Sequence, residues 1–244
     1  MSAESERRAY LQALGIDVWT LRGADAEFAE LSGEPSRANL SQPEGCASGA
    51  SAQMNVDEQG FDELRQTVAG CTNCSLHQSR TQTVFDVGNE SAYWMIIGEA
   101  PGAEEDRRGE PFVGRAGQLL DEMLRAVGLS RDAVFIANIL KCRPPNNRDP
   151  LIDEAAACRA YLNRQIELIS PRLILAVGRI AAQQLLETDA PLGRLRGQKH
   201  YLGDRQLPVV VTYHPAYLLR SPTQKRKAWQ DLCMASGIMQ QQAG

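Results

Sequence analysis

From residue 60 onward, apolar and polar positions follow two alternating patterns. Apolar residues that recur every three or four positions indicate amphipathic helices, and short continuous apolar runs are typical of strands buried on both faces. The helical pattern covers residues 61–70, 115–127, 151–169, 179–187 and 224–236. The strand pattern covers residues 93–97, 134–140, 173–177 and 208–213. Buried strands separated by helices predict an α/β fold, a three-layer α/β/α domain around a central, mainly parallel, four-stranded sheet.

The first 59 residues sustain neither pattern. Residues 31–59 are rich in Ser, Gly, Pro, Ala and Glu, which is the composition of a disordered linker. Residues 1–30 contain a short amphipathic segment, which we expect either to bind a protein partner or to pack against the domain. We expect that domain to span residues 60–244.

The net charge of −4 is unevenly distributed along the chain. Residues 1–59 carry four Lys or Arg and ten Asp or Glu, which leaves 22 basic and 20 acidic residues for the predicted domain. From Pro191 onward there are eight basic residues and only two acidic ones. Such a basic end of a domain can bind phosphates, although a solvated helix face has the same composition.

The chain shows no sign of export. Its first residues lack the apolar core of a signal peptide, and no stretch reaches the roughly 18 apolar residues that a membrane span requires. We therefore expect a cytoplasmic protein with reduced thiols and no contact with membranes.

Four cysteines of the predicted domain form a pattern. Cys71 and Cys74 are spaced as C-x2-C, and Cys142 and Cys158 follow much later. Four thiolates suit either a tetrahedral zinc ion or a four-iron cluster, and their spacing alone does not decide between the two. A thioredoxin-like redox pair is the competing interpretation, but that motif belongs at the start of a helix, whereas CTNC ends one. Cys158 could also be an ordinary buried helix residue.

Polar and glycine residues follow the predicted strands. The turn GEAPG (98–102) contains Glu99, Asn138 ends the second strand, and His214 follows the fourth. Open parallel sheets bind ligands at the carboxyl ends of their strands, so we expect these three side chains to line one cleft. The glycines of the turn allow a ligand to approach the backbone closely.

Each candidate side chain also has an ordinary structural interpretation. Phe112, in a loop bounded by glycines and a proline, would either stack on a flat ligand or fill the core. Asn138 would pair with the backbone or read the edge of a ligand. His214 would be catalytic or simply a satisfied structural histidine.

Five motifs together resemble those of the family-4 uracil-DNA glycosylases, the iron–sulfur branch of the uracil-DNA glycosylase superfamily. They are C-x2-C at 71–74, GEAPGAEED at 98–106, GEPFVGRAGQLL at 109–120, NILKCRPPNNRDP at 138–150 with Cys158, and HPAYLLR at 214–220. The resemblance covers about residues 60–236. It implies a uracil-DNA glycosylase-like fold and a 4Fe-4S cluster bound by Cys71, Cys74, Cys142 and Cys158.

The resemblance also implies roles for the cleft residues. Phe112 would stack on a uracil flipped out of the DNA, and Asn138 would bond its N3 and O4 edge. His214 would stabilise the negative charge on the departing base, and Glu99 would position water or support the sugar cation. The other implied contacts are substrate binding by Gly98, Ala100 and Gly102 and DNA binding by Arg143, Arg148 and Arg220. In the best-known branch an aspartate that handles water and a tyrosine stand where this chain has Ala100 and Gly102, which leaves Glu99 as the candidate for handling the attacking water.

The predicted function is that of a DNA repair enzyme, a monofunctional glycosylase that hydrolyses uracil from single- or double-stranded DNA and leaves an abasic site. No lysine is evidently placed for a Schiff base, which argues against lyase activity. The alternative is a non-catalytic module of the same fold that binds DNA or a replication partner, and a zinc-stabilised nucleotide-binding protein is a third possibility. We expect the protein to act as a monomer.

Overall fold

The structure is a computed structural model in which residues 56–243 are described, all of them within the compact unit Ala50–Gly244. The predicted segment 1–30 and nearly all of the predicted linker 31–59 lie outside the described residues. No helix within the described part is long and apolar enough to cross a membrane.

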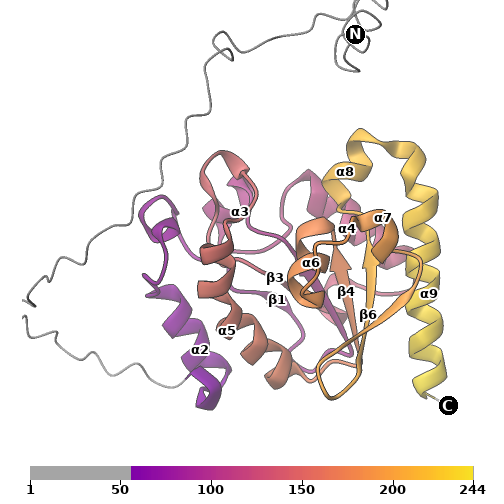
Figure 1. Ribbon diagram of the computed structural model, residues 1–244, viewed down its shortest axis with the longest axis horizontal. Helices are drawn as coiled ribbons and strands as arrows, with labels where there is room; N and C mark the ends of the chain where they lie inside the picture. Colours follow the sequence, from indigo (N-terminus) through magenta and orange to yellow (C-terminus); the bar gives the residue numbers. More distant parts are fainter. Residues whose placement is uncertain (1–55, 244) are drawn as a thin grey trace, which may run out of the picture. The chain divides into compact units, whose positions relative to one another are not determined.

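One six-stranded sheet forms the centre of the domain (Figure 1). Its strands are β1 (Val87–Gly88), β2 (Trp94–Gly98), β3 (Phe135–Asn138), β4 (Leu173–Val177), β5 (Lys199–Leu202) and β6 (Leu207–Thr212). Their spatial order is β1-β3-β2-β4-β6-β5, and the four central strands are parallel. These are the four predicted strands, and the predicted α/β fold class is confirmed.

The sheet nevertheless has six strands rather than the predicted four, because each edge carries one antiparallel strand. β1 is only two residues long, and β5 alternates between exposed and half-buried positions. Strands of this kind lack the continuous apolar run that marks a central parallel strand, so the hydrophobic pattern did not reveal them.

Helices cover both faces of the sheet. The α-helices are α2 (Phe61–Ala69), α3 (Ala103–Arg108), α4 (Arg115–Ala126), α5 (Ile152–Ile169), α6 (Arg179–Leu186), α7 (Leu192–Leu195), α8 (Pro215–Arg220) and α9 (Lys225–Ala243). The 3-10 helices are η1 (Val56–Glu58), η2 (Ser75–Gln78), η3 (Arg131–Ala133), η4 (Pro145–Asn147) and η5 (Pro222–Gln224). All five predicted helices are present, and α3, α7 and α8 are short additions to them.

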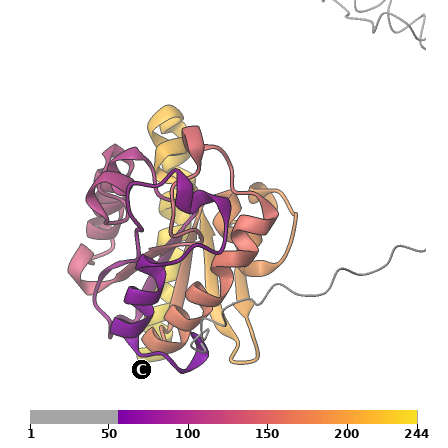
Figure 2. The same ribbon diagram turned by 90° about the vertical axis from the view of Figure 1, so that its left-hand side faces the viewer.

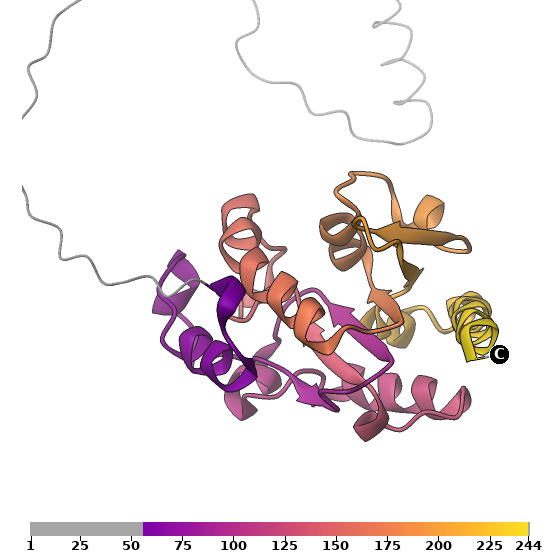
Figure 3. The same cartoon turned by 90° about the horizontal axis from the view of Figure 1, so that it is seen from below.

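The core consists of two apolar layers, one on each face of the sheet. Alternate residues of a strand point to opposite faces, so Met95 and Ile97 of β2 pack toward α5 and α6, while Trp94 and Ile96 pack toward α4, α8 and α9. Figure 3 shows α5 and α9 on opposite sides of the strands, and Figure 2 shows α2 beside α5 on the nearer face. The two layers make the domain the predicted α/β/α sandwich.

The described domain begins ahead of the predicted boundary at residue 60. Helix η1 packs against α5, where Arg164 Nε donates a hydrogen bond to the carbonyl oxygen of Gln59 at 2.8 Å. Gln59 itself is buried. The last residues of the predicted linker are therefore part of the domain.

The parallel strands end together at the edge of the sheet that faces the top of Figure 1. Gly98 of β2 is in register with Asn138 of β3, and Val177 of β4 with Thr212 of β6. The segments that follow these residues therefore emerge side by side, which places the predicted cleft residues at one end of the sheet.

Candidate active site

Four of the predicted residues meet at the strand ends. A Cβ atom added to Gly98 would lie 2.6 Å from Phe112 Cζ and would overlap Asn138 Oδ1, so both side chains lie directly against this glycine. The rings of Phe112 and His214 stack with centroids 5.6 Å apart and an interplanar angle of 30°. Of the three side chains expected to line one cleft, Asn138 and His214 therefore lie near the same aromatic ring, that of Phe112.

Asn138 is buried, with 2% of its surface exposed, and its side-chain oxygen Oδ1 has no hydrogen-bond partner among the described residues. An unpartnered buried acceptor is unfavourable, since its desolvation costs about 1–3 kcal/mol. Sequence alone left open whether this amide pairs with the backbone or faces a ligand. An amide oxygen left free beside an aromatic ring is suited to a ligand that brings its own donor.

Phe112 has a backbone φ of 54°, a left-handed conformation that is strained for a bulky side chain. The loop is held there by Arg131, which donates hydrogen bonds to the carbonyl oxygens of Pro111 and Phe112 and pairs with Asp121 at 3.1 Å. A Cβ atom at Gly117 would overlap the Phe112 carbonyl oxygen. The position of the ring is therefore fixed by the loop that carries it.

A carboxylate holds the other side of the same loop. Glu105 Oε1 accepts hydrogen bonds from the backbone N–H groups of Val113 and Gly114, each at 3.0 Å. Neither Glu105 nor Arg131 was among the predicted site residues. Both act on backbone groups, for which a sequence carries no direct signal.

His214 is partly buried, and its Nδ1 accepts a hydrogen bond from the backbone N–H of Ala216 at 3.2 Å. In the neutral ring the proton therefore lies on Nε2, which is a donor. The pKa of His214 is lowered to about 4, mainly by burial; Arg220 also lowers it, and Glu105 acts in the opposite direction. The imidazole is neutral at physiological pH and presents an N–H group.

Glu99 lies in the turn after β2 and is partly buried. Burial is the main cause that raises its pKa to about 7; Asp149 also raises it, and Arg179 lowers it. Asp149 and Arg179 form an ion pair of 2.6 Å. This pair was not predicted, although Asp149 belongs to the NNRDP loop and Arg179 follows the end of β4, two segments that the sequence singled out.

The remaining residues of the turn are positioned by backbone contacts. The carbonyl oxygens of Gly98 and Glu99 accept hydrogen bonds from the N–H groups of Ile139 and Leu140. Ala100 packs partly against the core, and Gly102 is the N-cap of α3. The turn is therefore joined to the segment that follows Asn138.

The three predicted DNA-contacting arginines lie in different settings. Arg220 is exposed at the end of α8, and Arg143 donates to Asn147 Oδ1 at 2.8 Å. Arg148 forms a two-pronged ion pair with the buried carboxylate of Glu154, at 2.8 and 2.6 Å. The guanidinium of Arg148 therefore already has an internal partner, and its contact with DNA stays a prediction.

The four patterned cysteines line one small cavity, of about 10 Å³. All are free thiols, and burial raises the pKa of Cys142 and raises that of Cys158 to about 11. Among the described residues no three His, Cys, Asp or Glu side chains form a group suited to one metal ion. The four sulfurs are thus assembled around a common space without the close approach that a single ion requires.

Hydrogen-bond donors point at the sulfurs of this cavity. Arg80 Nη1 lies 3.1 Å from Cys142 Sγ, and the Tyr161 hydroxyl lies 3.3 Å from Cys71 Sγ. The backbone N–H of Asn73 also approaches Cys71 Sγ at 3.5 Å. Donors of this kind stabilise thiolates rather than thiols.

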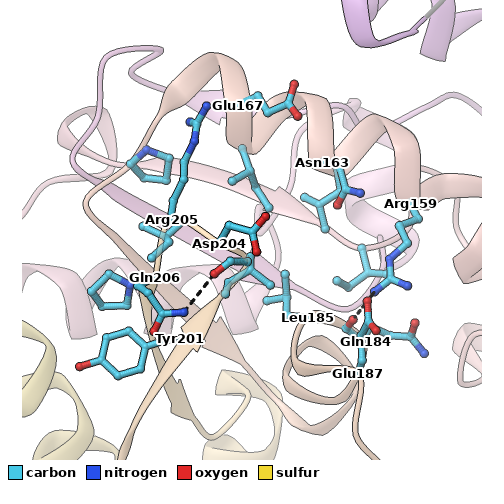
Figure 4. A pocket seen from close by; sticks show the side chains of 18 of the residues that line it. Arg159, Asn163, Glu167, Gln184, Leu185, Glu187, Tyr201, Asp204, Arg205 and Gln206 are labelled. Carbon is cyan, nitrogen blue, oxygen red and sulfur yellow. Dashed lines mark hydrogen bonds and ion pairs between the residues drawn. The ribbon is translucent and has the colours of Figure 1, made fainter.

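A larger hollow lies away from these residues. It is a groove of about 1020 Å³ between α5, α6 and the hairpin that joins β5 to β6 (Figure 4). Arg159 and Glu167 of α5 face Tyr201 and Arg205 of the hairpin across it. None of the predicted catalytic, base-binding or thiol residues lines the groove, so its size alone does not make it the active site.

Comparison with known proteins gives the chain its family. The family model described as the uracil DNA glycosylase superfamily matches residues 85–233. A type-4 uracil-DNA glycosylase of Archaeoglobus fulgidus is 44% identical over 170 residues, which are 67% of this chain and 85% of that protein. The enzymes of the same name from Pyrobaculum aerophilum and Thermotoga maritima are 42% and 43% identical, over 72% and 69% of this chain and 93% and 88% of those proteins. With most of the chain matched at this level, the protein belongs to the uracil DNA glycosylase superfamily and, within it, to the type-4 family.

Proposed function

We propose that this protein is a uracil-DNA glycosylase of base excision repair. It hydrolyses the N-glycosidic bond of uracil in single- or double-stranded DNA and leaves an abasic site. The observation that carries the proposal is the buried, unpartnered oxygen of Asn138 beside the Phe112 ring and the neutral His214. The similarity to type-4 uracil-DNA glycosylases supports the same activity.

Uracil fits the side chains of the cleft. It is flat, and its N3–H donor lies between two carbonyl acceptors, so Asn138 Oδ1 can accept from N3 while Nδ2 donates to O4. Cytosine has an acceptor at N3 and a donor at position 4, and the same amide orientation would leave both mismatched. The ring of Phe112 supplies the stacking face, and the base reaches the cleft only after it leaves the helical stack.

His214 acts on the other side of the base. As the glycosidic bond breaks, negative charge develops on the uracil ring and is carried largely by its carbonyl oxygens. The Nε2–H of the neutral imidazole donates a hydrogen bond to O2 and stabilises that charge. Such a bond is strong in a site from which water is excluded, because the donor is already oriented.

Glu99 acts on the sugar. In its ionised form the carboxylate stabilises the positive charge that develops on the deoxyribose and holds the water that adds to it. Because its pKa is about 7, the carboxylate loses its proton near neutral pH. The ion pair of Asp149 and Arg179 lies close enough to influence this ionisation.

The thiol cavity is proposed to hold a 4Fe-4S cluster on Cys71, Cys74, Cys142 and Cys158. Four thiols around one space, with donors directed at sulfur, fit a cluster whose iron atoms are bound by thiolates. When bound, the cluster crosslinks distant segments of the chain. The residues themselves hold the loop after Cys142 at the edge of the cleft, and base release requires no electron transfer.

DNA contacts are proposed for the exposed cations around the cleft. Arg143 and Arg220 would meet phosphates, and Arg148 braces the loop that carries Arg143 through its ion pair with Glu154. Phosphate contacts of this kind position the duplex without reading its sequence. Their loss should weaken the binding of all DNA alike.

We further propose that the protein works as a cytoplasmic monomer and that residues 1–30 bind a protein partner. The amphipathic pattern of that segment and the acidic composition of residues 1–59 support this role. Deletion of residues 1–30 tests it by a pull-down. Retention of every partner by the shortened chain would contradict it.

The central experiment measures the release of uracil from labelled oligonucleotides, single-stranded or paired with G or A. The wild type should produce alkali-sensitive sites only at uracil, and His214→Ala should reduce the rate about 10²–10³-fold. Cleavage without alkali would indicate lyase activity instead. A folded, brown wild-type protein that leaves every uracil in place would favour a DNA-binding or partner-binding module.

A further inference from the structure

Lys141 is a lysine buried inside the domain, with 1% of its surface exposed. Its ammonium Nζ donates hydrogen bonds to the carbonyl oxygen of Asn138 at 2.8 Å and to Gln165 Oε1 at 2.6 Å. Gln165 is itself buried and oriented by a hydrogen bond from Nε2 to the Phe85 carbonyl oxygen. Both acceptors of the ammonium are therefore fixed, and both are electrically neutral.

A buried cation with neutral partners leaves its charge uncompensated. Within residues 56–243 no carboxylate forms an ion pair with Lys141, and Asp86, the acid that influences it, pairs with Arg65 at 3.3 Å. The cost of burying an unpaired charge is several kcal/mol.

Lys141 also lines the thiol cavity, beside Cys142 and Cys158. Arg80 donates to Cys142 Sγ from another direction. Two basic residues, Arg80 and Lys141, therefore line a space walled by sulfur, where a thiolate-bound cluster would bring the missing negative charge.

We propose that Lys141 is a positioning residue that connects the cluster site to uracil recognition. Its ammonium balances the negative charge of the thiolates and, through the Asn138 carbonyl, fixes the strand end that carries the uracil-reading amide. This inference rests on the proposed glycosylase function and adds a residue to it. Loss of the cluster should then weaken uracil recognition more than it weakens binding to ordinary DNA.

The test replaces the ammonium with an uncharged side chain of similar length, Lys141→Met, in the full-length holoprotein. Inhibition of uracil release by free uracil should weaken about tenfold, the loss expected when one buried charge-assisted hydrogen bond is removed. Affinity for uracil-free DNA should change less than about twofold. The cluster's reduction potential should become more negative, because removal of a nearby cation disfavours the reduced form.

Two further variants make the result interpretable. Lys199→Met removes an exposed lysine of β5 and should change neither the inhibition by free uracil nor the reduction potential of the cluster. Gln165→Leu keeps the cation and removes one of its acceptors, so it should weaken uracil inhibition while leaving the potential nearly unchanged. If Lys141→Met does not fold, Gln165→Leu decides the positioning role.

Unchanged uracil inhibition in a folded Lys141→Met protein would overturn the positioning role. An unchanged reduction potential of the cluster in the same variant would overturn the charge-balancing role. A wild type that releases no uracil would overturn the proposed function instead, so the two failures are distinguishable.

Discussion

In the described part of the chain, the cleft at the strand ends has a hydrogen-bond acceptor without a donor, whereas the thiol cavity has positive charge without a negative partner. In the cleft, the amide oxygen of Asn138 has no donor among the described residues, and the neighbouring Phe112 and His214 carry no charge. In the cavity, Arg80 and Lys141 supply positive charge beside four thiols. The difference suits the two proposed occupants, a neutral, flat base in the first site and an anionic, sulfur-bound group in the second.

The two sites are also close in sequence, since Asn138 ends β3 and Cys142 follows four positions later. A substitution in one site is therefore informative only if the properties of the other are measured too. Four changes, from the largest expected effect to the smallest, separate the sites or reveal their coupling.

Cys71→Ser should have the largest effect, because a structural metal site contributes folding free energy directly. We expect loss of iron and of brown colour, and a melting temperature lower by about 10 °C or more. Iron analysis and thermal unfolding measure both. Cys233→Ser is the matched control, since Cys233 is exposed on α9 and outside the cavity. A Cys71→Ser protein that keeps its iron and its melting temperature would contradict the cluster assignment.

Asn138→Asp should affect the cleft alone. The carboxylate has the same shape but no N–H group for uracil O4, so kcat/KM for uracil release should fall about 10³-fold or more. Iron content should stay at the wild-type level. Asn163→Asp, an exposed change on α5, is the control and should leave the rate unchanged. Equal losses of rate in both variants would contradict a specific role for the amide.

Glu99→Gln should raise the stability of the protein above neutral pH and lower its activity. The pKa of Glu99 is raised, so its ionisation disfavours the folded state, and this penalty grows as pH rises from about 4.5 through 7. At pH 8 the variant should be more stable by about 1–2 kcal/mol, a value reduced for the exposure of the group. Uracil release by the wild type should rise with pH across 7, and the variant should be slow at every pH.

A variant that keeps the wild-type rise in rate across pH 7 would show that another group is responsible for it. Denaturant unfolding at pH 5 and pH 8 provides the companion control. The stability difference between Glu99→Gln and wild type should be small at pH 5, where both side chains are neutral in the folded protein.

Arg131→Met should have the smallest effect. It frees the carbonyl oxygens of Pro111 and Phe112, and the left-handed backbone of Phe112 can then relax. We expect KM for uracil-containing DNA to rise about five- to tenfold with little change in kcat. Arg125→Met, an exposed change on α4, should alter neither constant. An unchanged KM would show that the loop does not need the arginine.

The sequence predicted the centre of the fold well, because the four parallel strands are buried on both faces and read as continuous apolar runs. It did not reveal the edge strand β5, whose half-exposed residues resemble a loop. It also predicted that the residues after the strands would meet, since parallel strands end at one edge.

The residues that hold the site residues in position could not be predicted in the same way. Arg131 holds carbonyl oxygens 19 and 20 positions earlier in the chain, and this depends on how the loop and η3 fold together. Lys141 stands directly after an apolar run, where a charged residue ordinarily marks the exposed end of a strand. Only the structure shows that it turns inward between Asn138 and Gln165.

The ion pairs that hold the loop after Cys142 have a consequence for the rate at which the protein associates with DNA. Arg148 is held by Glu154, and Asp149 by Arg179, so the loop is tied to both α5 and α6. A segment tied in this way opens as one unit, and its amide hydrogens should exchange with solvent together and slowly. DNA would then meet a surface that is already formed. The association rate would be set by diffusion and by the opening of the base pair, with no waiting time for a loop to close.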